Sequence, residues 1–165
     1  MTKPFIIRRL LASDLEDYRK VRLEALRNEP ESFGSTYDIE ASRTLAEHAK
    51  RVASSAVFGA YFDDTIVGMI GFKREDGPKD AHKGRVWGFY VRPENRRHGM
   101  GAGLISAVIG FAGDCVEQLT LTVVQGNDAA VSLYKRFGFD IYGIEPKALK
   151  TTTGYSDEAL MVLFL

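Results

Sequence analysis

Residues 94–103 read ENRRHGMGAG, in which three alternating glycines follow two arginines and a histidine. Glycine lets a backbone come close to a ligand, and the free amides at the start of a helix favour an anion. The stretch therefore predicts a helix start that binds a phosphate group, such as that of a dinucleotide, a nucleoside triphosphate or coenzyme A. Apolar residues follow at helical spacing: Leu104, Ile105, Val108, Ile109 and Ala112.

The dinucleotide-binding fingerprint does not fit the spacing of these glycines. That fingerprint needs G-x-G-x-x-G directly after a strand. Counted from Gly99, the third glycine would fall at Leu104, and seven residues separate Gly99 from the strand ending at Val91. The P-loop pattern G-x-x-x-x-G-K-[ST] is absent from the sequence. A purely structural role, in which the glycines turn the chain and let the helix pack closely, leaves the neighbouring basic residues unexplained.

The hydrophobic pattern elsewhere predicts a mixed α/β (α+β) domain that spans residues 1–165. Helical stripes follow Ser13 and Thr44, each with a glutamate three residues on as in a capping box, and a further helix is expected over about 128–136. Because strands and helices do not alternate strictly, we expect a largely antiparallel sheet. The expected strands are 5–10, 56–62, 65–74, 85–91, 119–124, 139–145 and 159–165.

Composition excludes several functional classes. Lys+Arg and Asp+Glu both total 22, so no overall charge draws the chain to nucleic acid or to an anionic membrane. Cys115 is the only cysteine, which rules out an intramolecular disulfide, and the three histidines lack metal-ligand spacing, so no metal site is expected. With no signal peptide and no long apolar stretch, we expect a cytoplasmic protein.

The segment V-R-P-E-N-R-R-H-G-M-G-A-G-L resembles the acyl-CoA-binding segment of the GNAT superfamily of N-acetyltransferases. The family signature [Q/R]-x-x-G-x-[G/A] maps onto Arg96–Gly101, and N-D-A-A-V-S-L-Y-K-R-F-G-F (127–139) matches the second half of the pattern. The resemblance covers essentially the whole chain and is weakest over 30–50. It implies the GNAT fold, with a mostly antiparallel sheet of six to seven strands, about four helices, and a fourth and fifth strand that splay apart.

The same resemblance implies that acetyl-CoA is the cosubstrate. Backbone groups of Phe89 and Val91 would bind the pantetheine arm, and Gly88 would either let the strand bulge or relieve crowding beside Trp87. Amides at 97–99 and 101–102 would hold the diphosphate, and Asn127 would contact the cofactor, cap its helix, or do both. The implied cofactor-binding residues are Phe89, Tyr90, Val91, Arg96, Arg97, His98, Gly99, Met100, Gly101, Ala102, Asn127 and Tyr134.

Tyr134 is the expected general acid, because it matches the family tyrosine in that role. Attack of an amine on a thioester expels a thiolate, and a phenol with a pKa near 10 can protonate it at neutral pH. The alternative is a helix aromatic that packs in the core. The general base stays open, since neither RVWGFYV (85–91) nor LTLTVV (119–124) contains an acid. Glu40 and Glu75 are candidates, as are His82, a chain of waters, or an amine that is already neutral.

The expected acceptor is a primary amine of a small molecule or peptide, attacked directly in a ternary complex. Phe33, Tyr37, Trp87 and Tyr155 fall in segments that face the acceptor in the resembled family. The pair Asp157–Glu158 either selects a cationic acceptor or simply flanks the last strand. The rival hypothesis is a non-catalytic acyl-CoA-binding regulator, and a homodimer is a further expectation from the family.

Overall fold

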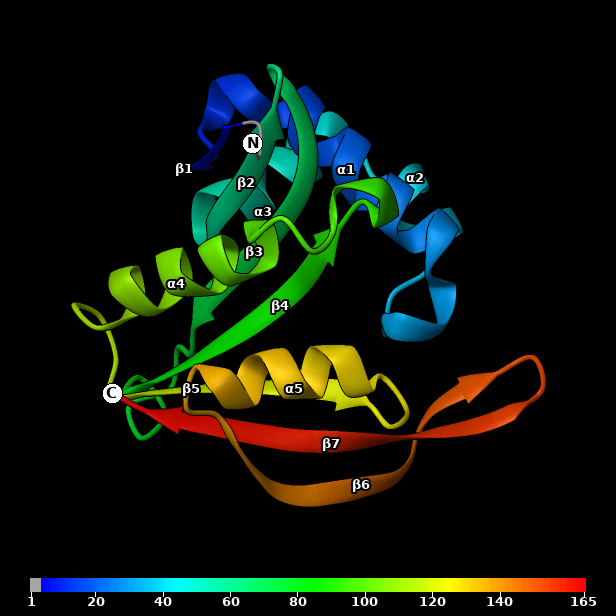
Figure 1. Ribbon diagram of the computed structural model, residues 1–165, viewed down its shortest axis with the longest axis vertical. Coiled ribbons are helices and arrows are strands. Elements are labelled where there is room, and N and C mark those ends of the chain that lie inside the picture. The colour runs from blue at the N-terminus through cyan, green and yellow to red at the C-terminus, as the bar shows by residue number, and fades with distance from the viewer. Residues whose placement is uncertain (1–3) are drawn as a thin grey trace.

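The computed structural model describes residues 4–165, in which one seven-stranded sheet carries helices on both faces (Figure 1). The strand order is β1-β2-β3-β4-β5-β7-β6, and only the β4–β5 pair is parallel. The expected mixed, mostly antiparallel sheet is thus confirmed. The strands are β1 Phe5–Arg9, β2 Ala56–Phe62, β3 Thr65–Arg74, β4 Lys83–Val91, β5 Gln118–Val124, β6 Asp140–Thr151 and β7 Gly154–Phe164.

Helices on opposite faces of the sheet enclose two separate hydrophobic cores. On one face α4 and α5 cover Leu119, Leu121 and Met161; on the other, α1 and α3 cover Val57, Met69 and Tyr90. The alternation of side chains along each strand assigns successive residues to opposite cores. The helices are α1 Leu15–Asn28, α2 Tyr37–Ser42, α3 Leu45–Ser54, α4 Met100–Ala112 and α5 Asp128–Arg136.

The ladder between β4 and β5 is the feature that positions a site. It contains only the pairs Lys83 with Gln118, Gly84 with Leu119 and Arg85 with Thr120. Beyond Arg85 the two strands diverge, and Figure 1 shows them opening as a V. The expectation that the fourth and fifth strands splay apart is therefore confirmed.

A β-bulge in β4 lies beside this opening. Gly88 has a φ of 65°, and the register with β3 shifts between the pairs Met69–Tyr90 and Gly71–Trp87. An extra residue of this kind bends and twists a strand. The glycine that accommodates Trp87 is instead Gly71, where a Cβ would stand 2.2 Å from Trp87 Cε2. Of the two roles considered for Gly88, the bulge is confirmed.

Two local expectations from the sequence need correction. The capping box at Thr44 and Glu47 forms as predicted, with N···O distances of 2.7 and 3.2 Å. The box predicted at Ser13 and Glu16 does not form, because Ser13 lies in a short 3₁₀ turn (Ala12–Asp14) that precedes α1. Asp14 is the N-cap residue of α1, but its side chain makes no cap bond to that helix and instead accepts from the Leu11 amide at 2.8 Å. The last hairpin is also longer than its apolar runs indicated, since polar residues continue both strands to a turn at residues 152–153. None of the helices within residues 4–165 is long and apolar enough to cross a membrane.

We predict that Gly71→Ala lowers the free energy of unfolding by about 1–3 kcal/mol, because the new methyl overlaps the Trp87 ring and overpacks the site. Gly110→Ala in α4 is the matched control. A Cβ at Gly110 meets nothing within 4 Å, so this variant should be neutral or gain about 0.5–1 kcal/mol from helix propensity. Urea unfolding of both variants tests the prediction, and equal stabilities would contradict it.

Candidate active site

A cleft of about 1040 Å³ occupies the opening between β4 and β5. One wall comes from β4 and the elements beyond it, and the other from β5, α5, β6 and β7. Its central residues are Val86, Trp87, Gly88 and Phe89 on β4, Leu121–Val124 on β5, and Asn127, Ala130 and Tyr134 around α5. The cleft thus joins segments that lie far apart in the sequence.

The loop before α4 has the geometry of an anion site. Arg97 and Gly99 both have left-handed φ angles, 63° and 86°, and α4 begins directly afterwards at Met100. Within residues 4–165 the backbone amides of 97–102 have no hydrogen-bond acceptor; the first amide to find one is Gly103, which donates to Gly99 O at 2.9 Å. Free amides at a helix start, with its positive dipole end, suit a phosphate.

The Arg96 side chain is directed away from this anion site. Its Nε donates to the Val91 carbonyl at 2.7 Å, and its Nη2 pairs with Glu29 at the end of α1. These bonds tie the loop to α1 and leave Arg97 and His98, both exposed, as the basic side chains beside the amides. Met100 is buried and presents only its backbone to the loop.

The free edge of β4 faces the cleft. The Arg92 amide donates back to Val67 O on β3 at 2.7 Å. Because the hydrogen-bonding direction alternates along a strand, the backbone groups of Phe89 and Val91 face the side toward β5. Phe89 lines the cleft, whereas the Val91 carbonyl already accepts from Arg96, so only the amide of Val91 is available there. Tyr90 lies between them with its side chain buried against α1, where its hydroxyl contacts Glu24 and Asn28 at 3.3 Å.

Tyr134 lies in the wall of the cleft. It is 6% exposed, and its ring packs against Phe89 and Phe139 with centroids 5.7 and 5.6 Å away. Its hydroxyl has no hydrogen-bond partner among the described residues. Burial raises the pKa of the phenol, which keeps it protonated at neutral pH. Asn127 caps α5, accepting from the Ala130 amide at 3.3 Å, and it also lines the cleft.

The expected base candidates lie in very different places. Glu40 is 0% exposed and lies behind the cleft wall, where Arg22, Arg51 and Arg43 approach its carboxylate at 3.4, 3.0 and 3.4 Å. Burial acts to raise its pKa, but the fields of Arg22 and Arg51 prevail and hold the pKa below its ordinary value. A carboxylate in this setting is a poor proton acceptor.

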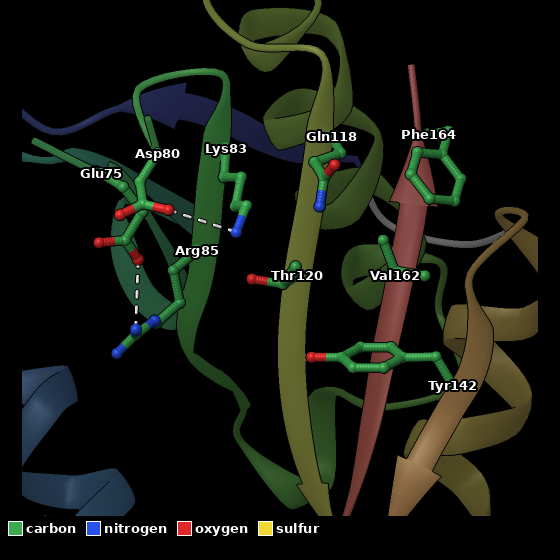
Figure 2. A pocket seen from close by; sticks show the side chains of 9 residues that line it. All are labelled: Glu75, Asp80, Lys83, Arg85, Gln118, Thr120, Tyr142, Val162 and Phe164. Carbon is green, nitrogen blue, oxygen red and sulfur yellow. Dashed lines mark hydrogen bonds and ion pairs between the residues drawn. The ribbon is translucent and has the colours of Figure 1, made fainter. Parts of the chain in front are cut away.

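Glu75 lines the cleft rim and pairs with Arg85 at 3.2 Å, as Figure 2 shows. His82 precedes β4 and does not line the cleft. A second depression, of about 620 Å³, adjoins the end of β4 and β5 at which the two strands are paired, and Figure 2 shows the side chains that line it. Tyr142 extends there from β6 across β7, with its hydroxyl toward Thr120 on β5, and lines both depressions.

The structure places one carboxylate of the pair Asp157–Glu158 in the cleft, a pair for which the sequence left open selection of a cationic acceptor or a position flanking the last strand. Glu158 on β7 pairs in register with Val124 of β5 and lines the cleft. Burial raises the pKa of its carboxyl, and the nearby charge of Glu145 adds to this effect, while a hydrogen bond with Thr122 opposes it. The sequence did contain a sign of this placement, because side chains alternate between the two faces of a strand. The apolar Ala159 and Met161 belong to the core under α4 and α5, which leaves Glu158 on the opposite face of the sheet.

Of the four aromatic residues expected on the acceptor side, Phe33 and Trp87 line the cleft. Tyr37 does not; its hydroxyl accepts a hydrogen bond from Arg27 on α1. Tyr155 lies near the tip of the β6–β7 hairpin, where Lys147 covers its ring at 5.3 Å. Within residues 4–165 no group of three or more His, Cys, Asp or Glu side chains could hold a metal ion.

This fold and this cleft define an acyl-transferring class of enzyme, and comparison with known proteins agrees. The model of the Acetyltransferase (GNAT) family matches residues 20–139, and the chain belongs to that family. The spermine/spermidine N(1)-acetyltransferase of Bacillus subtilis (strain 168) is 29% identical over 111 residues, which cover 64% of this chain and 72% of that protein.

Solved structures of low sequence identity share the fold. A GNAT-family acetyltransferase from Streptococcus pneumoniae is 21% identical with a TM-score of 0.87, covering 98% of this chain and 100% of that one. The yncA protein of Salmonella typhimurium, solved with its cofactor acetyl-CoA, is 18% identical with a TM-score of 0.82, covering 99% and 95%. The predictions of the family, the fold and an acetyltransferase are confirmed, and a non-catalytic regulator is not favoured.

We predict that Glu40→Gln lowers the free energy of unfolding by about 3–5 kcal/mol near neutral pH, because it leaves the buried Arg22 guanidinium without its counter-charge. Since the folded-state pKa of Glu40 lies below its ordinary value of 4.5, its contribution is complete above that value. The contribution disappears as the pH falls through the folded-state pKa.

Urea unfolding of wild type and variant between pH 3 and pH 7 would measure this difference. The exposed Asp38→Asn on the same short helix is the control and should change stability little at any pH. A destabilisation by Glu40→Gln that persists unchanged at the lowest pH would contradict the assignment.

Proposed function

We propose that this acetyltransferase moves an acetyl group from acetyl-CoA to the primary amine of a small molecule or peptide, by direct attack in a ternary complex. The observation that carries the proposal is the cleft between β4 and β5, which has Tyr134 in its wall. The free amides at the start of α4 lie next to its Phe89, because a Cβ on Gly101 would stand 3.2 Å from Phe89 Cζ. Acetyl-CoA, when bound, supplies the acetyl group as a thioester.

The chain offers a matched surface for such a cosubstrate. The amides of residues 97–102 would hold a diphosphate, assisted by the exposed side chains of Arg97 and His98. The free edge of β4, through the backbone of Phe89 and the amide of Val91, would bind the amides of the pantetheine arm, as an added strand does. A main-chain N–H of that edge would also stabilise the oxyanion that forms on the thioester carbonyl.

Tyr134 would act as the general acid. As the amine nitrogen bonds to the acetyl carbon, the carbon–sulfur bond breaks, and the phenol donates its proton to the departing sulfur. The raised pKa keeps that proton in place until it is needed, and the absence of a partner for the hydroxyl among the described residues leaves it free to donate.

Glu158 is the carboxylate best placed to take the proton from the attacking amine. It lines the cleft, and its raised pKa makes it a stronger base than an ordinary surface carboxylate. Glu75 is the second candidate because it lines the same cleft, although Arg85 holds its carboxylate. Glu40 does not fit this role, because three arginines surround it.

We expect Tyr134→Phe to lower kcat roughly 100-fold with a much smaller change in KM, because only the transition state loses the proton donor. The measurement is release of CoA thiol over a panel of amines. Tyr61→Phe, which removes a hydroxyl bonded to Asp17 outside the cleft, is the control for loss of a phenol. A Tyr134→Phe enzyme with the kcat of wild type would refute the acid assignment.

Glu158→Gln is expected to lower kcat/KM roughly 100-fold and to change its pH profile. Because a base must be deprotonated, wild-type kcat/KM should rise as the pH increases through the raised pKa of Glu158. The variant should lack that rise and retain only the titration of the acceptor amine itself. Asp140→Asn, on the exposed edge strand β6, is the control. Superimposable profiles for wild type and Glu158→Gln would assign the base elsewhere.

A further inference from the structure

Arg22 is a buried cation with unused hydrogen-bonding capacity. It is only 5% exposed, yet its Nε and Nη1 atoms have no hydrogen-bond partner among the described residues. Within residues 4–165 the one hydrogen bond of its guanidinium runs from Nη2 to Glu40 Oε1, at 3.4 Å. Burial lowers the pKa of the guanidinium, against the opposing field of Glu40. Buried donors without partners are rare, because each loses its bonds to water without replacement.

The charge around Arg22 is unbalanced. Arg22, Arg43 and Arg51 all contact Glu40, so three guanidinium groups share one carboxylate and two positive charges remain. Arg22, Arg43 and Arg51 line the cleft, whereas Glu40 lies behind them. This arginine cluster, composed of Arg22, Arg43 and Arg51, therefore gives one wall of the cleft a local positive charge.

Arg22 also lies beside the expected reaction centre. Its Nη1 is 3.5 Å from the point where a Cβ would stand on Gly88, in the bulge of β4. The rings of Phe33 and Trp87 flank the guanidinium, with centroids 5.4 and 5.6 Å away, and both rings line the same cleft. Flanking aromatic faces hold a guanidinium in one orientation and reduce its access to water.

The opposite wall carries the complementary charge. Glu145 and Glu158, on β6 and β7, line the cleft across from the arginine cluster. The wall next to β4 also carries Glu29, Glu47 and Glu75, but its cations outnumber them: Arg22, Arg43, Lys50, Arg51, Lys73 and Arg85. On the wall next to β5, the charged residues that line the cleft within residues 4–165 are Glu145 and Glu158. The cleft is thus polarised, with an excess of positive charge next to β4 and carboxylates next to β5. A ligand with a negative group at one end and an ammonium group at the other would meet both walls favourably.

We propose that Arg22 binds a carboxylate of the acceptor, so that the acceptor is a small amine that also carries a carboxylate, such as an amino acid. The inference rests on the proposed function, that is, on acetylation of an amine in this cleft. A carboxylate is planar, and a guanidinium can meet it with charge-assisted hydrogen bonds. A polyamine, the acceptor for which the Bacillus subtilis relative is named, has only positive charges and would be repelled by the arginine cluster.

The experiment compares acceptors that differ only in the carboxylate. Glycine, β-alanine, glutamate and phenylalanine are each paired with their carboxamides, and spermidine is included as a purely cationic amine. Rates of CoA thiol release are compared at equal concentrations of unprotonated amine, since removing the carboxylate changes the pKa of the amine. We expect at least one free acid to exceed its carboxamide in kcat/KM by roughly 10- to 100-fold, as for a hydrogen bond to a charged group.

Variants at Arg22 test whether this residue carries the preference. Arg22→Met removes the charge and the donors and should abolish the preference, mainly through a higher KM for the acid. Arg22→Lys keeps the charge and should retain part of the preference for the free acid. Lys20→Met, on the exposed side of the same helix, is the control and should retain the whole preference for the free acid. If Arg22→Met alone does not fold, Arg22→Met combined with Glu40→Gln removes both partners of the buried pair.

A binding measurement separates recognition from chemistry. Calorimetry with CoA-saturated protein should show N-acetyl amino acids binding more tightly than their carboxamides to wild type, and equally to Arg22→Met. Turnover of amines without preference for the acid, a preference for spermidine, or an unchanged preference in Arg22→Met would overturn this inference alone. Absence of turnover with every amine, despite binding of acetyl-CoA, would overturn the proposed function and this inference with it.

Discussion

The early end of the β4–β5 ladder is the constraint on which the rest of the structure depends. Every other neighbouring pair of strands continues through its length, apart from bulges, but this pair stops after Arg85 and Thr120. Beyond this point β4 stays paired with β3, but its backbone groups on the side of β5 have no strand partner within residues 4–165 and are open to a ligand. The bulge at Gly88 bends β4 here, and the helix that follows β5 brings Tyr134 into this opening. The start of α4, with its free amides, lies beside it, since a Cβ on Gly101 would stand 3.2 Å from Phe89 Cζ. A cosubstrate that bonds like a strand fits this arrangement.

Two glutamates show how the walls of the cleft differ. Glu40 and Glu158 are the same residue type, yet their pKa values shift in opposite directions. Three guanidinium groups stabilise the charged form of Glu40, whereas Glu158 is partly buried near another carboxylate. Glu40 therefore keeps its negative charge to a lower pH than an ordinary glutamate, next to the arginine cluster, whereas Glu158 binds a proton more readily. The same separation of charge across the cleft is what we expect to orient an acceptor.

Much of the cosubstrate side was predictable because its residues are contiguous. The free amides, the glycine with a left-handed φ angle and the start of α4 all lie within Arg97–Ala102. The capping bond of Asn127 likewise joins residues only three positions apart. The Arg96 side chain was not predictable, because its partner Glu29 comes from α1, far away in the sequence. The acceptor side of the cleft is built throughout from contacts between residues that are far apart in the sequence. Tyr37 and Tyr155 suit a binding surface by residue type but lie outside the cleft, and Glu158 lies inside it.

The sequence by itself determined the family, the order of strands and helices, and the loop that suits a diphosphate. These features depend on periodicity, glycine placement and helix starts, which act over a few residues. Only the tertiary structure decided which charges meet across the cleft. Arg22, Glu40, Tyr134 and Glu158 come from four different elements, and the pKa of each titrating group is set by neighbours that the fold supplies. The family motif was enough to suggest Tyr134 as the acid. Burial and charge pairing, however, are properties of the packed chain, so no local pattern could single out Glu158 as the proposed base or Arg22 as the proposed carboxylate-binding residue.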